Sequence, residues 1–384
     1  MTISEFTNIA LTSPIYGYYN RTSVFGPEGD FVTSPEISQM FGESFKRFPK
    51  FQKSIRCVHL VETSAELRSV QAKKLLCEEI EYNQNLIQDQ KSLNSSVSKF
   101  GNIQIKWHNV LDDVELTHRS SVMVMAHEFF DALPIHRFEL SQNGWTEILI
   151  DIDTPENRIQ STPSGIEYTT PSIQNSAVSS FSGNNFKSPF PEESLDKIKF
   201  KFVRTKKSTF NSAAFLANEK YSKLFEVGDS IEISPESAII VQKLATMIND
   251  TNGAGLVVDY GQNYTQGSTF RGVSKHKFVD PLANPGEIDL TADVDFSYLI
   301  DNIKPIANAF GPVEQGFFLH EMGIQDRLMQ LLNMASTVKT QEELVSTYKR
   351  LTDPNSMGRI YKFLAIVPKS VETAPVAMEQ KDKK

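Results

Sequence analysis

Apolar positions near the start of the chain recur with the period of a helix, and glycine and proline interrupt them. Apolar residues three or four positions apart predict a helix over residues 2–11. A glycine-rich aromatic stretch over residues 16–31 predicts turns. The Ser-Pro-Glu sequence at 34–36 is typical of a capped helix start, so we expect a helix over residues 36–48.

In the next part of the chain, short apolar runs alternate with segments whose apolar residues have helical spacing. Residues 57–61 form an apolar run that ends in an acid, and Ser64 opens an amphipathic helix over residues 64–76. Residues 103–107 alternate as a strand, and residues 121–126 are continuously apolar, as in strands buried within parallel sheets. This order predicts an α/β fold built on an open sheet.

Two polar stretches lack such periods, and we expect insertions near residues 82–100 and over residues 154–193. Strands are expected between them, around residues 137–138 and 145–152. The C-terminal part predicts a strand and a capped helix over residues 229–248, a buried strand over 255–261, helices near 325–332 and 341–350, and a strand over 361–367.

We divide the chain into three parts on this basis. Residues 1–43 hold the N-terminal helix and a segment that would cover the substrate or cofactor. Residues 44–368 form the main domain, and residues 369–384 form a charged tail that we expect to be disordered.

Composition narrows the functional class. With 384 residues, 40% apolar and 22% charged, the chain is typical of a globular protein, and no apolar run approaches the roughly 20 residues that span a bilayer. We therefore expect no membrane insertion. A net charge of -8 argues against nucleic-acid binding and is compatible with basic peptides as partners. Two cysteines predict neither a disulfide framework nor a metal site, and no targeting segment is readable near the N-terminus.

Polar residues follow three of the predicted strands: Glu62, the loop His127 to Asp131, and Asp259. Ligands of open parallel sheets bind outside the carboxyl ends of strands, so these residues predict one crevice. Glu62 could accept both ribose hydroxyls of a nucleoside cofactor. Alternatively it is a helix cap or a solvated acid.

The loop that follows residues 121–126 offers two acids. It superficially resembles the zinc-protease sequence HExxH, but that site needs a second imidazole where this chain has Asp131. Glu128 and Asp131 can instead place two carboxylates on one side of a turn, which suits a guanidinium group. Local capping of the turn before Pro134 is the alternative.

A stretch dense in turn-formers and charges, residues 271–296, contains His276 and Asp289. Long ordered loops are more often functional than idle. The alternative is a capped loop before a helix that starts near Asp293.

Read in order, several motifs together resemble the MidA-like family of arginine methyltransferases, whose mitochondrial members assist assembly of respiratory complex I. An ordered series of this kind is far more specific than any one motif. The matching motifs are GYY (17–19), GDFVTSPEIS (29–38), FGE (41–43), HLVETS (59–64), AHEFFDALP (126–134), SPE (234–236), VDYG (258–261), PGEIDLTADVDF (285–296) and MG (357–358).

The resemblance implies a Rossmann-like S-adenosylmethionine-dependent methyltransferase fold and assigns roles to single residues. Glu62 would hold the cofactor ribose, Asn109 would lie near the adenine, and His127 would belong to the same cofactor-binding set. Glu128 and Asp131 would orient the guanidinium as the catalytic pair. The implied substrate-binding residues are Asp30, Glu36, Asp259, His276 and Asp289. Asp259 could equally be a structural cap at its strand end.

One part of the family pattern is missing. Family members carry a first strand, a glycine-rich loop and the start of a helix where this chain has only residues 44–58, and no glycine lies between Gly42 and Gly101. No backbone there can approach the cofactor's methionine portion as that loop does. We expect the neighbouring strands to lack pairing on one side. The apolar residues expected to be uncovered include Leu60, Val61, Val122 and Val124.

The resemblance therefore implies a protein arginine methyltransferase that acts on a respiratory complex I subunit in mitochondria. The missing loop favours an alternative, a catalytically inactive assembly chaperone or a truncated isoform. The sequence leaves the oligomeric state open.

Overall fold

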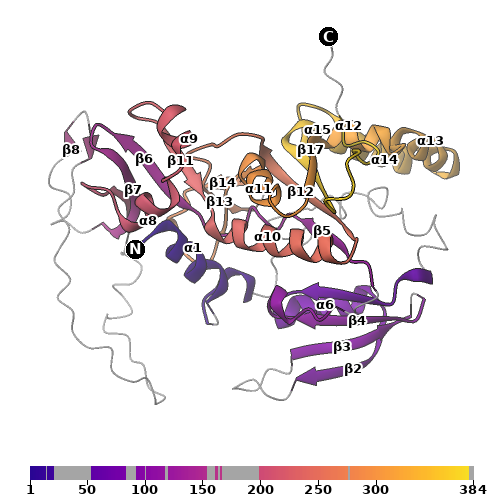
Figure 1. Ribbon diagram of the computed structural model, residues 1–384. Helices are drawn as coiled ribbons and strands as arrows, with labels where there is room; N and C mark the ends of the chain where they lie inside the picture. The colour runs from indigo at the N-terminus through magenta and orange to yellow at the C-terminus, as the bar shows by residue number, and fades with distance from the viewer. Residues whose placement is uncertain are drawn as a thin grey trace, which may run out of the picture. The chain divides into compact units, whose positions relative to one another are not determined.

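The computed structural model describes residues 1–13, 15–20, 53–83, 92–99, 101–116, 120–153, 161–162, 165–166, 199–275 and 277–379. The predicted helix over residues 36–48 lies outside them. The chain divides into two compact units, described separately below (Figure 1). Unit 1 comprises Met1–Leu11, Pro134–Pro235 and Gln266–Ala292, and unit 2 comprises Thr12–Leu133, Glu236–Thr265 and Asp293–Lys384.

Unit 1 is built on an antiparallel sheet with the strand order β10-β7-β6-β11. The amphipathic helix α1 contributes Phe6, whose ring lies 5.7 Å from that of Phe200 on β10. Its elements are α1 (Ile3–Thr12), β6 (His136–Ser141), β7 (Gly144–Ile152), β8 (Ser161–Thr162), β9 (Gly165–Ile166), β10 (Phe200–Arg204), α8 (Phe210–Phe215), α9 (Glu219–Lys223), β11 (Ser230–Ile233), β13 (Arg271–Ser274), β14 (Lys277–Val279) and β15 (Asp289–Thr291).

Unit 2 contains a first sheet of order β1-β4-β3-β2, in which β1 and β4 are parallel. Helix α6 begins after Ser64, whose hydroxyl accepts the Leu67 N–H, and it packs on Ile105 and Trp107 of β4. The elements are η1 (Tyr18–Asn20), β1 (Cys57–Val61), α6 (Ala65–Lys74), β2 (Cys77–Asn83), β3 (Ser92–Ser98), β4 (Ile103–His108) and η2 (Leu111–Asp113).

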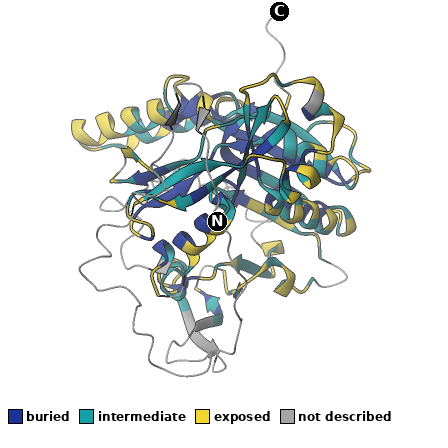
Figure 2. Cartoon of the chain, turned by 90° about the vertical axis from the view of Figure 1, so that its left-hand side faces the viewer, coloured by how far each residue is buried: buried dark blue, intermediate teal, exposed yellow. Residues whose placement is uncertain are grey.

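The second sheet of unit 2 places β12 at its centre, parallel to β5 and β16 and antiparallel to β18. Helix α10 buries Val241, Leu244 and Ile248 against this sheet. Its elements are β5 (Met123–His127), α10 (Pro235–Asp250), β12 (Ala254–Gln262), β16 (Val294–Asp295), α11 (Phe296–Ile303), β17 (Asn308–Glu314), α12 (Gln315–Glu321), α13 (Ile324–Met334), α14 (Val338–Thr352), α15 (Met357–Ile360) and β18 (Tyr361–Val367). Figure 2 shows buried positions gathered on the central strands and exposed positions along the outer faces of helices.

The predicted α/β class is confirmed. The insertions stay a prediction, although one of the polar stretches contains a strand, and the predicted disorder of the tail is wrong for the part that the structure describes. The polar stretch near residues 82–100 contains β3, which pairs on both sides and buries Ser96 and Ser98, so serines form part of a sheet there. The predicted tail is ordered over residues 369–379, where Met378 packs against Val258 and Phe363.

Each sheet of unit 2 has an edge where the sequence predicted a missing strand. Among the described strands, β1 pairs only with β4, and β5 pairs only with β12. The predicted set of uncovered residues needs correction, because Leu60 and Val124 pack partly against core clusters. Val61 is exposed at 43%, as predicted, and Met123 and Met125, which were not in the predicted set, are exposed at 65% and 60%.

We predict that the chain expressed alone unfolds without a cooperative thermal transition or aggregates. Covering one large apolar side chain contributes roughly 1.5–3 kcal/mol, and a whole domain is stable by only about 5–15 kcal/mol. Inserting a family-type strand, glycine-rich loop and helix between Glu43 and Phe45 should restore a sharp transition, measured by calorimetry. A sharp and reversible transition of the unaltered chain would contradict this prediction.

Candidate functional site

The second sheet of unit 2 brings two predicted strand ends together. Strand β5 runs parallel to β12 (Figure 1), and in this pairing His127 is opposite Val258. The loop that leaves β5 therefore starts beside Asp259 and Tyr260. Gly261 allows β12 to continue past β16, because a Cβ on that glycine would lie 2.0 Å from the Val294 carbonyl oxygen.

Asp259 holds the loop after β5 in place. Its side chain is fully buried, and Oδ2 accepts hydrogen bonds from the N–H groups of Phe129 (3.2 Å), Phe130 (3.0 Å) and Asp131 (3.4 Å). Its Oδ1 accepts the Tyr260 N–H at 2.9 Å. Both oxygens are thus engaged by backbone donors, which favours the structural cap among the two roles that the sequence left open.

The capped loop presents Glu128 and Asp131. Glu128 has φ +48°, a left-handed conformation that is uncommon for a residue with a side chain. The Tyr361 hydroxyl donates to Glu128 Oε1 at 3.1 Å, and the Tyr260 hydroxyl donates to Asp131 Oδ2. Tyr260 and Tyr361 were not selected from the sequence, since only their register between β12 and β18 brings them behind the loop.

Burial and the proximity of like charges shift the pKa values of the titratable groups at this loop. Burial raises the pKa of the Asp259 carboxyl well above its usual range, and the neighbouring Asp131 carboxylate raises it further. Burial also lowers the pKa of His127 to about 4. His127 is therefore neutral at neutral pH, and the 3.6 Å contact between its Nε2 and Glu128 Oε1 is not an ion pair there.

The predicted cofactor residues Glu62 and Asn109 lie at the carboxyl ends of β1 and β4, joined by Arg68. The Arg68 side chain is 1% exposed and donates to the Glu62 carbonyl oxygen (2.6 Å) and to Asn109 Oδ1 (2.7 Å). Glu62 Oε1 accepts the Ser64 N–H at 2.8 Å. Burial raises the pKa of Glu62, while the Ser64 hydrogen bond and the charge of Arg68 oppose that shift.

Arg68 was missed by the sequence reading, although one signal was available. Arg68 lies on the same buried face of α6 as Ala72, four residues later. A charged residue on the buried face of a helix needs a buried partner.

Of the remaining predicted site residues, only Asp289 lies within the described residues. Asp30, Glu36 and His276 lie outside the described residues. Asp289 belongs to unit 1, where it is buried at the start of β15 and accepts the Leu290 N–H at 2.9 Å.

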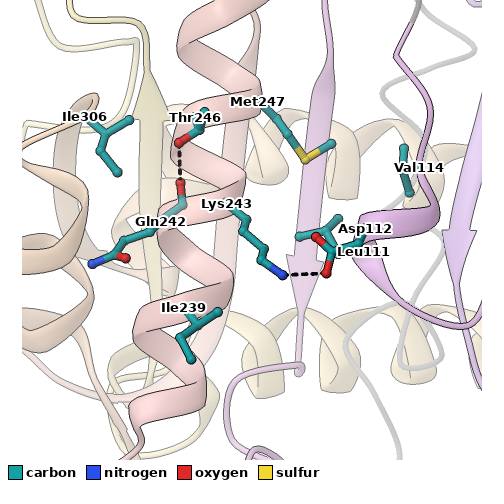
Figure 3. A pocket seen from close by; sticks show the side chains of 9 residues that line it. All are labelled: Leu111, Asp112, Val114, Ile239, Gln242, Lys243, Thr246, Met247 and Ile306. Carbon is teal, nitrogen blue, oxygen red and sulfur yellow. Dashed lines mark hydrogen bonds and ion pairs between the residues drawn. The ribbon is translucent and has the colours of Figure 1, made fainter.

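A separate open groove of about 480 Å³ lies between α10 and the segment after β4 (Figure 3). Lys243 Nζ forms an ion pair with Asp112 Oδ2 at 2.6 Å in its wall. None of the predicted site residues lines this groove, whose lining consists of Leu111, Asp112, Val114, Ile239, Gln242, Lys243, Thr246, Met247 and Ile306.

Comparison with known proteins identifies the family. Residues 39–313 match the sequence profile of a family described as "Putative S-adenosyl-L-methionine-dependent methyltransferase". The chain belongs to this methyltransferase family. Proteins named mitochondrial protein arginine methyltransferase NDUFAF7 are similar: those of Xenopus tropicalis and Homo sapiens are 33% and 31% identical, over 96% of this chain and 83% and 80% of their own lengths.

Solved structures agree on the fold. Two structures from Burkholderia thailandensis, the second with bound S-adenosyl-homocysteine, superpose with TM-scores of 0.66 and 0.63 at 20% identity. The matches cover 98% of this chain and 89% and 90% of those chains. The predicted Rossmann-like methyltransferase fold and S-adenosylmethionine as the family's cofactor are confirmed. The roles assigned to single residues remain predictions.

The relatives also contain residues that this chain lacks. The alignment with the Xenopus tropicalis protein spans 408 positions, whereas 96% of 384 residues is only about 369. Roughly 39 or more positions are therefore filled only in the relative. No helix within the described ranges is long and apolar enough to cross a membrane.

We predict that Asp259→Asn changes the pH dependence of stability. The folded-state pKa of Asp259 lies above its ordinary value of 3.8, so its stabilising contribution is present below that value and is lost as the pH rises through the raised pKa. Asparagine keeps an oxygen acceptor for the loop but carries no charge. The stability advantage of the wild type over Asp259→Asn should be larger near pH 4.5 than near pH 8. It is measured by urea unfolding, with both proteins carrying the family-type insertion that restores a cooperative transition.

The matched control is Asp250→Asn at the exposed end of α10. That variant should show no such trend relative to the wild type. A constant free-energy difference between wild type and Asp259→Asn across this pH range would refute the prediction.

Proposed function

We propose that this methyltransferase transfers methyl groups to arginine side chains of a protein, and that its substrate is a subunit of mitochondrial respiratory complex I. The observation that carries the arginine proposal is the Glu128–Asp131 pair, two carboxylates three residues apart on one loop, each held by a tyrosine hydroxyl. A guanidinium group is permanently cationic and offers a planar fork of donors that suits such a pair. The names of the relatives support the proposal.

For methyl transfer, the protein needs mainly to align the guanidinium nitrogen with the methyl group and to stabilise the positive charge. S-adenosylmethionine would supply the methyl group and leave as S-adenosyl-homocysteine, so that one nitrogen–carbon bond replaces one sulfur–carbon bond, and the proton lost from the methylated nitrogen would pass to solvent. Glu128 and Asp131 would orient the guanidinium nitrogen and stabilise its positive charge. Their side chains have little solvent contact, which strengthens both effects.

On the cofactor side, the described residues fit the nucleoside part. Glu62 presents a partly buried carboxylate at the end of β1, as expected for a ribose-binding acid. Asn109 is exposed at the end of β4, and its Oδ1 accepts from Arg68, so its amide N–H₂ group could serve as the donor for adenine.

A second candidate function, an inactive assembly chaperone, is favoured by one observation. No glycine occurs between Gly42 and Gly101, where the family carries its glycine-rich cofactor loop. Such a chain would retain the loop of Glu128 and Asp131 for binding while lacking support for the cofactor's methionine part.

Calorimetric titration with S-adenosyl-homocysteine separates the two functions. We expect binding in the micromolar range, weakened at least tenfold by Glu62→Gln, because an amide cannot accept from both ribose hydroxyls. Absence of binding by the wild-type chain would favour the chaperone.

We predict that Glu128→Gln reduces arginine methylation about a hundredfold, since it removes one of two charges that hold the guanidinium. The measurement is mass spectrometry of a complex I subunit co-expressed with each variant. Glu321→Gln, at an exposed end of α12, is the control. Methylation that is unchanged in Glu128→Gln would remove Glu128 from the mechanism.

A further inference from the structure

Two tyrosines from adjacent core strands stand behind the loop of Glu128 and Asp131. Tyr260 on β12 is opposite Tyr361 on β18, and their rings meet edge to face with centroids 5.5 Å apart. Each hydroxyl donates to a different carboxylate: Tyr260 to Asp131 and Tyr361 to Glu128. The carboxylates lie on a loop, whereas their donors lie on strands.

These hydrogen bonds reduce the repulsion between neighbouring carboxylates. Asp131 lies close enough to the buried Asp259 for each charge to disfavour the other. Among the described residues, the titratable groups near the two hydroxyls include the carboxylates of Glu128, Asp131 and Asp259 and the neutral His127. A hydroxyl donor directed at Asp131 offsets the repulsion and keeps that side chain in one orientation.

The Tyr361 hydroxyl remains a donor at neutral pH. Burial raises the pKa of Tyr361 well above its usual range, and the charges of Glu128, Asp131 and Asp259 raise it further. Tyr260 is only 7% exposed, and its hydroxyl donates to Asp131. An effect of Tyr260 on a bound ligand would therefore pass through the Asp131 carboxylate.

We propose that Tyr260 is a positioning residue for substrate recognition, whose hydroxyl holds the Asp131 carboxylate in the orientation that accepts the substrate guanidinium. This inference rests on the proposed arginine specificity. Tyr361 has the same relation to Glu128, through a hydrogen bond of 3.1 Å.

A double-mutant cycle tests whether Tyr260 acts through Asp131. The full-length variants Tyr260→Phe, Asp131→Asn and the combination are compared with wild type in binding a single-arginine peptide, by calorimetry at saturating S-adenosyl-homocysteine. The same peptide with citrulline, the neutral analogue of arginine, is titrated in parallel. Partial unfolding weakens both peptides alike, so the arginine-to-citrulline affinity ratio isolates recognition of the charge.

We expect Tyr260→Phe to lower this ratio roughly tenfold, in keeping with loss of one hydrogen bond to a charged group. In the Asp131→Asn background the same change should lower it less than twofold, because the two residues act as one unit. Tyr348→Phe, which removes a hydroxyl that bonds His320 Nε2 at 2.8 Å, is the matched control and should leave the ratio unchanged.

The outcomes separate this inference from the proposed function. If Asp131→Asn lowers the ratio but Tyr260→Phe does not, or if the two losses simply add, the positioning role is overturned and the arginine proposal stands. If Asp131→Asn leaves the ratio unchanged, the carboxylate pair does not recognise the guanidinium, and both proposals are overturned.

Discussion

The hydrogen bonds from the loop after β5 to the carboxylate of Asp259 are the interaction on which the candidate site depends. A buried carboxylate is costly unless several donors satisfy it, and three consecutive backbone N–H groups with that of Tyr260 do so here. In return, the loop is fixed against the end of β12. Glu128 can then adopt its left-handed backbone conformation, and Asp131 lies within reach of the Tyr260 hydroxyl.

This interaction also concentrates negative charge. Three carboxylates lie near the Tyr361 hydroxyl, and the imidazole of His127 is neutral. A site of this kind favours a cation with several donors over a neutral or anionic ligand. The same repulsion makes orientation important, because a carboxylate that is free to rotate can turn away from its neighbours. The two tyrosine hydroxyls supply that orientation from the rigid strands.

The cofactor side is organised by a different buried charge. Arg68 connects α6, the end of β1 and the end of β4 through its hydrogen bonds to Glu62 and Asn109. The sheet that carries these residues has an edge at β1, and the sheet that carries Asp259 has an edge at β5. In a methyltransferase fold with a first strand, that strand would connect two such edges. We therefore expect the shortness of the segment 44–58 to affect cofactor binding and stability together.

The sequence by itself determined the elements whose pattern is local. The run Cys57–Val61 became β1 with the predicted bounds, Ser64 became the cap of α6, and the motif series identified the methyltransferase family. It also placed Glu128, Asp131 and Asp259 at strand ends, because an acid after an apolar run is visible without any partner. Tertiary structure alone decided what those acids do. The role of Asp259 depends on donors about 130 residues away, and the partner of Glu128 is Tyr361, 233 residues away. The strand β3 could not be predicted from its serine-rich sequence, and Met378 was wrongly placed in a disordered tail, for the same reason. Their order depends on pairing with β4 and on packing against β18, which the local sequence does not reveal.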